Sequence, residues 1–226
     1  QSLVANGSAI RAMFEEGKKM AAIYGAENVY DFSLGNPCTP PPESVRKAAV
    51  DILTKEPELM VHGYMSNSGY EDVGESIAAS LNRRFGTEFT KENLVMTVGA
   101  AGGLNVALKT ILEPGDEVLL FAPYFGEYNN YISNFDGVPV VVEPDPIRFS
   151  MNLRAAEPKI TAKTKAVIIN SPNNPTGVVY TEEEIKALAD LLETKSVEYG
   201  HAIYLISDEP YREIVYGGQT VPYLTK

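Results

Sequence analysis

Two apolar segments, each followed by polar residues, restrict the fold of this chain more than any other feature. Residues 165–170 and 202–207 read as strands, and a stretch with helical spacing separates them. Buried strands of a parallel sheet are continuous apolar runs, and ligands of open α/β sheets bind beyond the carboxyl ends of the strands. We therefore expect Asn174, Asp208 and Tyr211, which follow these strands, to lie at the ligand-binding edge of a sheet.

The same alternation of strand and helix covers most of the chain. The predicted strands are residues 94–98, 117–122, 138–142, 165–170 and 202–207, and the predicted helices are 102–112, 126–135, 153–160 and 182–199. Strands that alternate with helices favour a mainly parallel sheet with helices on both faces. The predicted fold class is therefore a three-layer α/β/α arrangement.

The N-terminal residues do not follow this alternation. Residues 8–24 have helical spacing with Ser8 as a candidate N-cap, and residues 29–34 read as a strand. The run Pro40–Pro42 is stiff and non-helical, so we place a boundary near Pro37.

Two amphipathic helices are predicted after this boundary. One starts at Glu43, and the other carries Val73, Ile77 and Leu81. The apolar face of the first consists of Val45, Ala48, Ala49, Ile52 and Leu53.

Composition excludes several classes of protein. The 226 residues are 44% hydrophobic, which is enough to bury a core, and a net charge of −11 argues against a nucleic-acid partner. The single cysteine, Cys38, cannot form an intramolecular disulfide and suits a reducing compartment. No apolar run is long enough for a membrane span, and Gln1–Leu3 opens no signal peptide. We expect a soluble cytoplasmic protein with no membrane partner.

The segment Thr97–Leu104 joins a predicted strand to a helix through small residues. Free backbone N–H groups at such a turn, together with the helix dipole, can bind a phosphate. Close packing of helix on strand is the simpler explanation of the same small residues. The Walker lysine and the Gly-x-Gly-x-x-Gly pattern are absent, so the segment supports nucleotide binding only weakly.

Aromatic residues follow the strand at 117–122. An aromatic ring there, such as Phe125, can cover the face of a planar ligand, whereas Tyr128, Ile132 and Phe135 read as core. Taken singly, each of these residues is better explained by core packing.

Asn174 and Asp208 each have a structural explanation as well. Asn174 can serve a generic Asn-Pro turn, and Asp208 can be the N-cap of a helix with Pro210 in its first turn. Their joint position at two strand ends, together with the phenol of Tyr211, favours a binding site.

These motifs resemble the pyridoxal-phosphate-dependent aminotransferases of class I/II, the aspartate aminotransferase superfamily of fold type I. The most specific part is Asn173–Gly177 followed by Asp208-x-x-Tyr211, and the resemblance extends from Leu34–Pro37 to the end of the chain. It implies that residues 1–36 form an N-terminal arm and part of a small domain. Residues 37–226 would be the cofactor-binding large domain, incomplete at its C-terminus.

The resemblance also implies roles for individual residues. Asp208 would pair with the ring nitrogen of the cofactor, and Asn174 and Tyr211 would bind its phenolic oxygen. Phe125 would stack on the ring, and the backbone of Ala100 and Ala101 would bind the phosphate. Asp208 and Tyr211 are thus the catalytic candidates, and no metal is implied.

Further residues match the family outside the strand ends. Tyr64 would reach the phosphate of a neighbouring subunit, which implies a homodimer with shared sites; an ordinary loop tyrosine is the alternative. Gly35 and Asn36, together with Asn174, would border the substrate. Cys38, His62 and His201 match no catalytic position, and we expect structural roles for them.

The sequence departs from the family pattern at one essential point. The lysine that forms a Schiff base with the cofactor and the arginine that binds the substrate carboxylate have no counterpart before Lys226. We expect an N-terminal portion of a longer enzyme, inactive as a separate fragment.

The resemblance implies transfer of an amino group between an amino acid and a 2-oxo acid in amino acid metabolism. Two alternatives remain open: a C–S lyase or other β-eliminating enzyme with the same cofactor, and a non-catalytic truncated member.

Overall fold

The computed structural model describes residues 9–32, 35 and 39–225, with the side chains of residues 9–11 left aside. Contacts within the chain divide it into two compact units, Gln1–Met65 and Ser66–Lys226. The predicted division into an N-terminal arm, residues 1–36, and a cofactor-binding domain, residues 37–226, refers to roles in the whole enzyme and stays a prediction.

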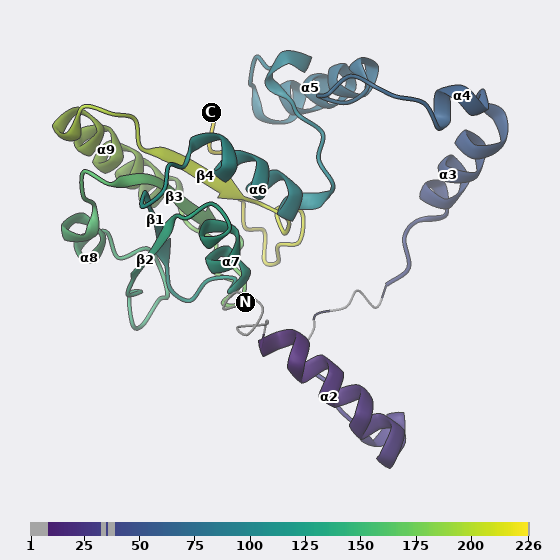
Figure 1. The fold of residues 1–226 in the computed structure, drawn as a ribbon, viewed down its shortest axis with the longest axis horizontal. Helices are drawn as coiled ribbons and strands as arrows, with labels where there is room; N and C mark the ends of the chain where they lie inside the picture. The colour runs from purple at the N-terminus through teal and green to yellow at the C-terminus, as the bar shows by residue number, and fades with distance from the viewer. Residues whose placement is uncertain (1–8, 33–34, 36–38, 226) are drawn as a thin grey trace. The chain divides into compact units, whose positions relative to one another are not determined.

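The regular structure described in the first unit is helical (Figure 1). It contains α2 (Ala9–Tyr24), the 3-10 helix η1 (Ala26–Asn28), α3 (Glu43–Lys55) and α4 (Glu58–Val61). The helix predicted over 8–24 is confirmed, while its candidate cap Ser8 lies outside the described residues.

The strand predicted over 29–34 is wrong for residues 29–32, and residues 33–34 lie outside the described part. Alternating apolar residues become a strand only when another chain segment pairs with them. In the part of the first unit that the structure describes, no strand offers such pairing.

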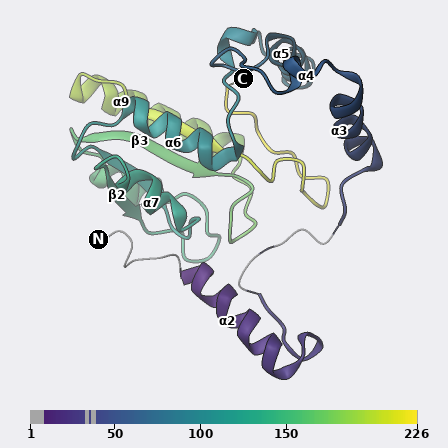
Figure 2. The ribbon, with the colours of Figure 1, turned by 45° about the vertical axis from the view of Figure 1, so that its right-hand side comes forward.

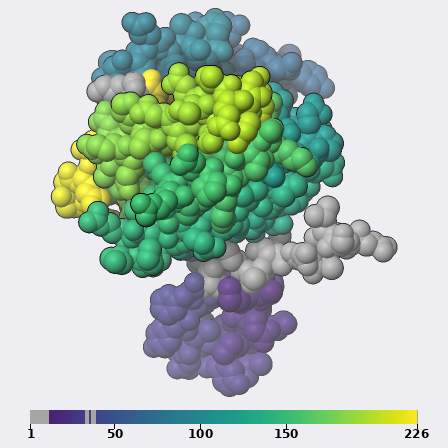
Figure 3. All heavy atoms as spheres, turned by 90° about the vertical axis from the view of Figure 1, so that its left-hand side faces the viewer, coloured from purple at the N-terminus to yellow at the C-terminus, as the bar shows by residue number. Residues whose placement is uncertain are grey.

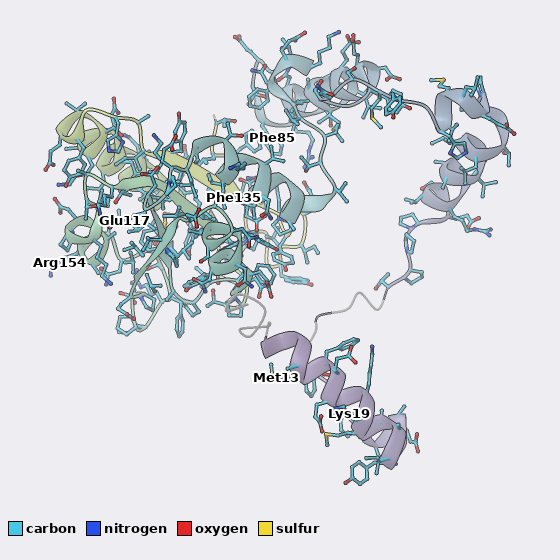
Figure 4. All side chains as sticks on the ribbon, viewed as in Figure 1. Met13, Lys19, Phe85, Glu117, Phe135 and Arg154 are labelled. Carbon is cyan, nitrogen blue, oxygen red and sulfur yellow. The ribbon has the colours of Figure 1, made fainter. Side chains whose placement is uncertain are left out.

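The apolar face predicted for α3 is present but exposed. Val45, Ile52 and Leu53 keep 55%, 50% and 65% of their surface accessible, and α3 has no buried residue. On α2, the labelled side chain of Met13 is 54% exposed (Figure 4). Periodicity therefore predicted these helices without predicting what their apolar faces contact.

The second unit carries the alternating pattern. Its elements are α5 (Glu71–Phe85), η2 (Lys91–Asn93), α6 (Gly99–Ile111), β1 (Glu117–Phe121), α7 (Glu127–Ser133), β2 (Val138–Val142), α8 (Leu153–Ala156), η3 (Glu157–Lys159), β3 (Thr164–Asn170), α9 (Glu182–Tyr199) and β4 (Tyr204–Asp208).

All pairings in the described sheet are parallel, in the order β2-β1-β3-β4. The last pair of the β3–β4 register joins Asn170 to Asp208, so the two polar strand ends lie side by side. A parallel sheet with helices packed on its faces confirms the predicted α/β fold class.

Alternate residues of the strands bury two separate cores. Leu119, Val167 and Ile169 pack with residues of α8 and α9, whereas Leu120 and Ile168 pack with residues of α6 and α7. Successive side chains of a strand point to opposite faces, which gives this division. Figure 1 shows α6, α7, α8 and α9 around the sheet, and Figure 2 shows α6, α7 and α9 beside it. In Figure 3 the segments that contain α8 and α9 are coloured green and yellow-green.

The helix predicted over 182–199 is confirmed as α9, and local chemistry defines its ends. Thr181 and Glu184 form a capping box, and Gly200 ends the helix in the left-handed region at φ 73°. None of the helices in the described residues combines the length and apolar character of a membrane span.

Two predictions were wrong in this unit. The helix predicted over 153–160 divides into α8 and η3, where Pro158 cannot donate a backbone hydrogen bond. The strand predicted over 94–98 is extended at Leu94 but is not assigned as a strand. Its Met96 N–H donates to the Ser68 carbonyl at 3.0 Å, and the segment pairs with no strand of the described sheet.

Candidate active site

A pocket of about 210 Å³ lies in the second unit, where β3 and β4 end and α6 and α7 begin. It is lined by Ala100, Ala101, Leu104, Phe125, Tyr128, Tyr131, Asn170, Asn174, Asp208, Pro210 and Tyr211. All of the cofactor-binding residues predicted within this unit are in this set. Parallel strands bring their carboxyl ends to one edge, which is why residues far apart in the sequence meet here.

Asp208 ends β4 with its side chain partly buried in the pocket. The phenol of Tyr128 donates a hydrogen bond to Asp208 Oδ2 at 2.6 Å. No hydrogen bond from a described residue reaches the other carboxylate oxygen, Oδ1, so an acceptor remains for a ligand. No helix begins after Asp208, since residues 210–213 form a turn, and this removes the N-cap explanation.

Asn170 connects the two strand ends and was not predicted. Its side-chain amide donates to the Asp208 carbonyl at 2.8 Å, and its Oδ1 accepts from the Asn174 backbone N–H at 2.6 Å. Asn170 is only 4% exposed, so these bonds satisfy a buried polar group. A polar residue at the end of a buried apolar strand is the sequence signal that could have identified it.

Asn174 and Tyr211 meet across the pocket, although 37 positions separate them in the sequence. The side-chain amide of Asn174 donates to the Tyr211 hydroxyl at 3.3 Å. The predicted pair of amide and phenol is therefore close enough for both groups to bind one ligand atom.

The loop that presents Asn174 is fixed by Asn173. Asn173 Oδ1 accepts from the Thr176 backbone N–H at 3.1 Å, and the Asn173 N–H donates to the Val178 carbonyl at 2.9 Å. Asn173 is 7% exposed. The turn explanation for the Asn-Pro sequence is thus correct for this loop, and the loop also supplies a pocket residue.

The N-terminus of α6 forms another wall. Gly99 opens the helix at φ 70°, and Ala100 and Ala101 follow in the first turn. The first N–H groups of a helix have no acceptor within the helix, so this turn offers donors and a positive dipole end to the pocket.

Phe125 and Tyr128 contribute aromatic surface. Their ring centroids are 5.7 Å apart with an interplanar angle of 82°, an edge-to-face contact. Tyr128, Ile132 and Phe135 pack in the core as predicted. Tyr128 was assigned only to the core because its spacing is helical. Its position in the first turn of α7, three residues after Phe125, is the signal for its second role.

The pocket favours neutral carboxyl and phenol groups. Burial raises the pKa of Asp208, the Tyr128 hydrogen bond lowers it, and the charge of Glu209 raises it further. Burial first, and then the hydrogen bond to Asp208, raise the pKa of Tyr128. Burial and the charge of Glu127 also raise the pKa of Tyr131. A positively charged group in the pocket would stabilise the ionised form of Asp208.

Other predicted residues belong to the first unit or lie outside the description. Tyr64 is fully exposed and Gly35 is exposed within the first unit, so neither has a described contact with the pocket. Asn36 and Cys38 lie outside the described residues.

The two histidines make no contribution to the pocket lining. The ring nitrogens of His201 lie 3.2 Å from the Ala202 carbonyl and 3.1 Å from the Ala162 carbonyl, before β4 and β3 begin. His62 follows α4 in the first unit.

Comparison with known proteins agrees with this geometry. The sequence pattern of the family described as aminotransferase class I and II matches residues 27–225. A probable aspartate/prephenate aminotransferase from Aquifex aeolicus is 37% identical over 194 residues, which cover 84% of this chain and 46% of that protein.

Solved structures give the same result. An amino transferase from Eubacterium rectale superposes with a TM-score of 0.92 and 47% identity, over 96% of this chain and 55% of its own. Aspartate aminotransferase from Thermus thermophilus, solved with maleate, superposes with a TM-score of 0.83 and 32% sequence identity. This match covers 98% of this chain and 56% of that one.

This chain spans about half the length of the curated relatives that it matches. Members of the matched family depend on pyridoxal phosphate. With a parallel sheet, a carboxylate at its edge and a family pattern that covers most of its length, the chain belongs to the class I and II aminotransferases.

Proposed function

We propose that the protein containing this chain is a pyridoxal-phosphate-dependent aminotransferase that passes an amino group between an amino acid and a 2-oxo acid. The observation that carries this proposal is the Asp208 carboxylate, which faces a pocket bordered by the Asn174–Tyr211 pair. The names of the relatives, which include aspartate, aspartate/prephenate and N-acetyl-LL-diaminopimelate aminotransferases, support the reaction class.

The residues of the pocket fit this cofactor. Oδ1 of Asp208 is available to accept a hydrogen bond from a protonated ring nitrogen, Asn174 and Tyr211 can bind a phenolic oxygen, and Phe125 offers an aromatic face. The backbone of Ala100 and Ala101 offers N–H groups to a phosphate. When bound, pyridoxal phosphate supplies an electron sink for the substrate α-carbon.

Asp208 has the central role in this proposal. The pocket withdraws its carboxylate from water and raises its pKa, and Tyr128 counters this by a hydrogen bond to Oδ2. A cationic ring nitrogen at Oδ1 would stabilise the carboxylate, and the carboxylate would in turn keep that nitrogen protonated.

The remaining predicted roles belong to the same proposal. Tyr64 of a second copy would bind the phosphate in a homodimer, and Gly35 and Asn36 would border the substrate. No lysine or arginine is among the residues that line the described pocket, and the proposed function requires a Schiff-base lysine and a carboxylate-binding arginine to reach it. We place the enzyme in the cytoplasm, in amino acid biosynthesis.

The test is a half-reaction with the complete gene product. Mixing it with pyridoxal phosphate and single amino acids, without a 2-oxo acid, should convert the aldehyde form of the cofactor to the amine form, seen by absorbance. Addition of a 2-oxo acid should reverse the change. Release of ammonia or sulfide without that conversion would instead support a β-eliminating enzyme, and no change with any amino acid would support a non-catalytic member.

A further inference from the structure

Arg212, directly after Tyr211, has a guanidinium that is largely withdrawn from water. Its side chain is 11% exposed and its Nε donates to Glu209 Oε2 at 2.6 Å. Nη1 donates to the Val221 carbonyl at 2.8 Å, and Nη2 donates to the Pro222 carbonyl at 2.7 Å. One side chain therefore connects the turn after β4 to a segment about ten residues later.

Glu209 is held from its other side by β4. The Ser207 hydroxyl donates to Glu209 Oε1 at 2.7 Å, and the Glu209 side chain is 20% exposed. Ser207 and Glu209 flank Asp208, and Arg212 follows Tyr211. The network thus lies on both sides of Asp208 and of the turn that carries Tyr211.

Aromatic rings complete the environment of Arg212. Its guanidinium carbon lies 5.2 Å from the ring centroid of Phe85 and 5.0 Å from that of Tyr223. The two rings stack with centroids 4.1 Å apart. Phe85, labelled in Figure 4, is the last residue of α5, and its neighbour Arg84 forms an ion pair with Glu213.

The contacts of Tyr211 itself are weak by comparison. Its side chain is 36% exposed, and the bond from Asn174 is long at 3.3 Å. The backbone of the turn, more than this bond, must therefore determine where the Tyr211 phenol lies. Within the turn, the Arg212 N–H donates to the Glu209 carbonyl at 3.3 Å and the Ile214 N–H donates to the Tyr211 carbonyl at 2.8 Å. The Arg212 side chain adds charged hydrogen bonds that tie this turn to the Glu209 carboxylate and to the carbonyls of Val221 and Pro222, and such bonds are stronger than neutral ones.

We propose that Arg212 is a positioning residue of the pocket, which holds the Glu209–Arg212 turn so that the Tyr211 phenol stays beside Asn174. A lysine could keep the charge and the bond to Glu209. It could not reproduce the planar set of donors that reaches the Val221 and Pro222 carbonyls at the same time.

The test measures the contact between Tyr211 and Asn174 directly in the complete gene product. With 3-fluorotyrosine incorporated, the fluorine NMR signal of Tyr211 is identified by its loss in Tyr211→Phe. In the otherwise unchanged protein, Asn174→Ala should shift this signal. In Arg212→Met, which keeps the side-chain length but has no donors, the same Asn174→Ala change should no longer shift it.

Two controls separate positioning from general destabilisation. Leu192→Ala removes a core side chain of α9, 3% exposed, and should lower the unfolding temperature while the Asn174-dependent shift stays. Arg212→Lys should keep part of the Asn174-dependent shift. If Arg212→Met folds and shows the full Asn174-dependent shift, the proposal is overturned. If Arg212→Met does not fold, Arg212→Lys takes its place, and a full Asn174-dependent shift in that variant overturns the proposal.

The consequence for the cofactor rests on the proposed function. Pyridoxal phosphate should dissociate about tenfold more readily from Arg212→Met, as followed by absorbance. If the unchanged protein does not bind pyridoxal phosphate, the proposed function fails, while the NMR experiment still decides the role of Arg212.

Discussion

The phenol of Tyr128 donates a 2.6 Å hydrogen bond to the Asp208 carboxylate, although the two residues are 80 positions apart. Tyr128 comes from α7 and Asp208 from the end of β4, so the bond joins a helix on one face of the sheet to the edge where the pocket lies. It uses Oδ2 and leaves Oδ1 for a ligand.

Tyr128→Phe should raise the pKa of Asp208. The hydrogen bond stabilises the ionised carboxylate, and its loss leaves burial and the charge of Glu209, both of which raise this pKa. Carboxyl carbon NMR titration, with the Asp208 signal identified by Asp208→Asn, measures the change. Tyr180→Phe removes the hydroxyl of another buried tyrosine and should leave the signal unchanged; an unaltered titration in Tyr128→Phe would refute the argument.

Asp208 should make stability depend on pH with a defined sign. Its folded pKa is raised above the ordinary 3.8, so the unfolded chain releases the proton first as pH rises. Relative to Asp208→Asn, the free energy of unfolding should be highest below the ordinary pKa and fall as pH rises through the folded pKa. Urea unfolding of both proteins at a series of pH values measures this free energy. Asp72→Asn, which removes an exposed carboxylate, is the control. A stability difference between the unchanged protein and Asp208→Asn that grows in favour of the unchanged protein as pH rises would contradict the prediction.

Asp208→Ala in the complete gene product should lower turnover by several powers of ten, because the electron sink of the cofactor needs a protonated ring nitrogen. The fold should change little, since the side chain lies at the edge of the sheet and outside both cores. Steady-state kinetics and thermal unfolding measure these effects. Nearly normal turnover would exclude the proposed role of Asp208.

Tyr64→Phe should weaken cofactor retention about tenfold, by loss of one hydrogen bond to a phosphate, and only in the dimer. Equilibrium dialysis of pyridoxal phosphate against dimer and monomer fractions measures this retention. Tyr30→Phe is the matched control, since Tyr30 is an exposed tyrosine of the same unit. Equal retention by Tyr64→Phe and the unchanged protein would remove Tyr64 from the site.

Local patterns in the sequence determined most of the second unit. The continuous apolar runs of β3 and β4, and the capping box and terminal glycine of α9, depend on neighbouring residues only. The meeting of Asn174, Asp208 and Tyr211 also followed from sequence, because parallel strands end at the same edge of a sheet.

Only the tertiary structure decided which groups form hydrogen bonds with the pocket residues and with the turn that follows β4. The sequence predicts an apolar side of α7 but not that the Tyr128 hydroxyl reaches Asp208, and it does not show that Arg212 contacts carbonyls nine and ten residues later. The apolar segment 94–98 likewise looked like a strand, yet a strand needs a partner that local pattern cannot supply. Periodicity depends on short-range geometry, whereas hydrogen-bond partners and sheet pairing depend on where distant segments pack.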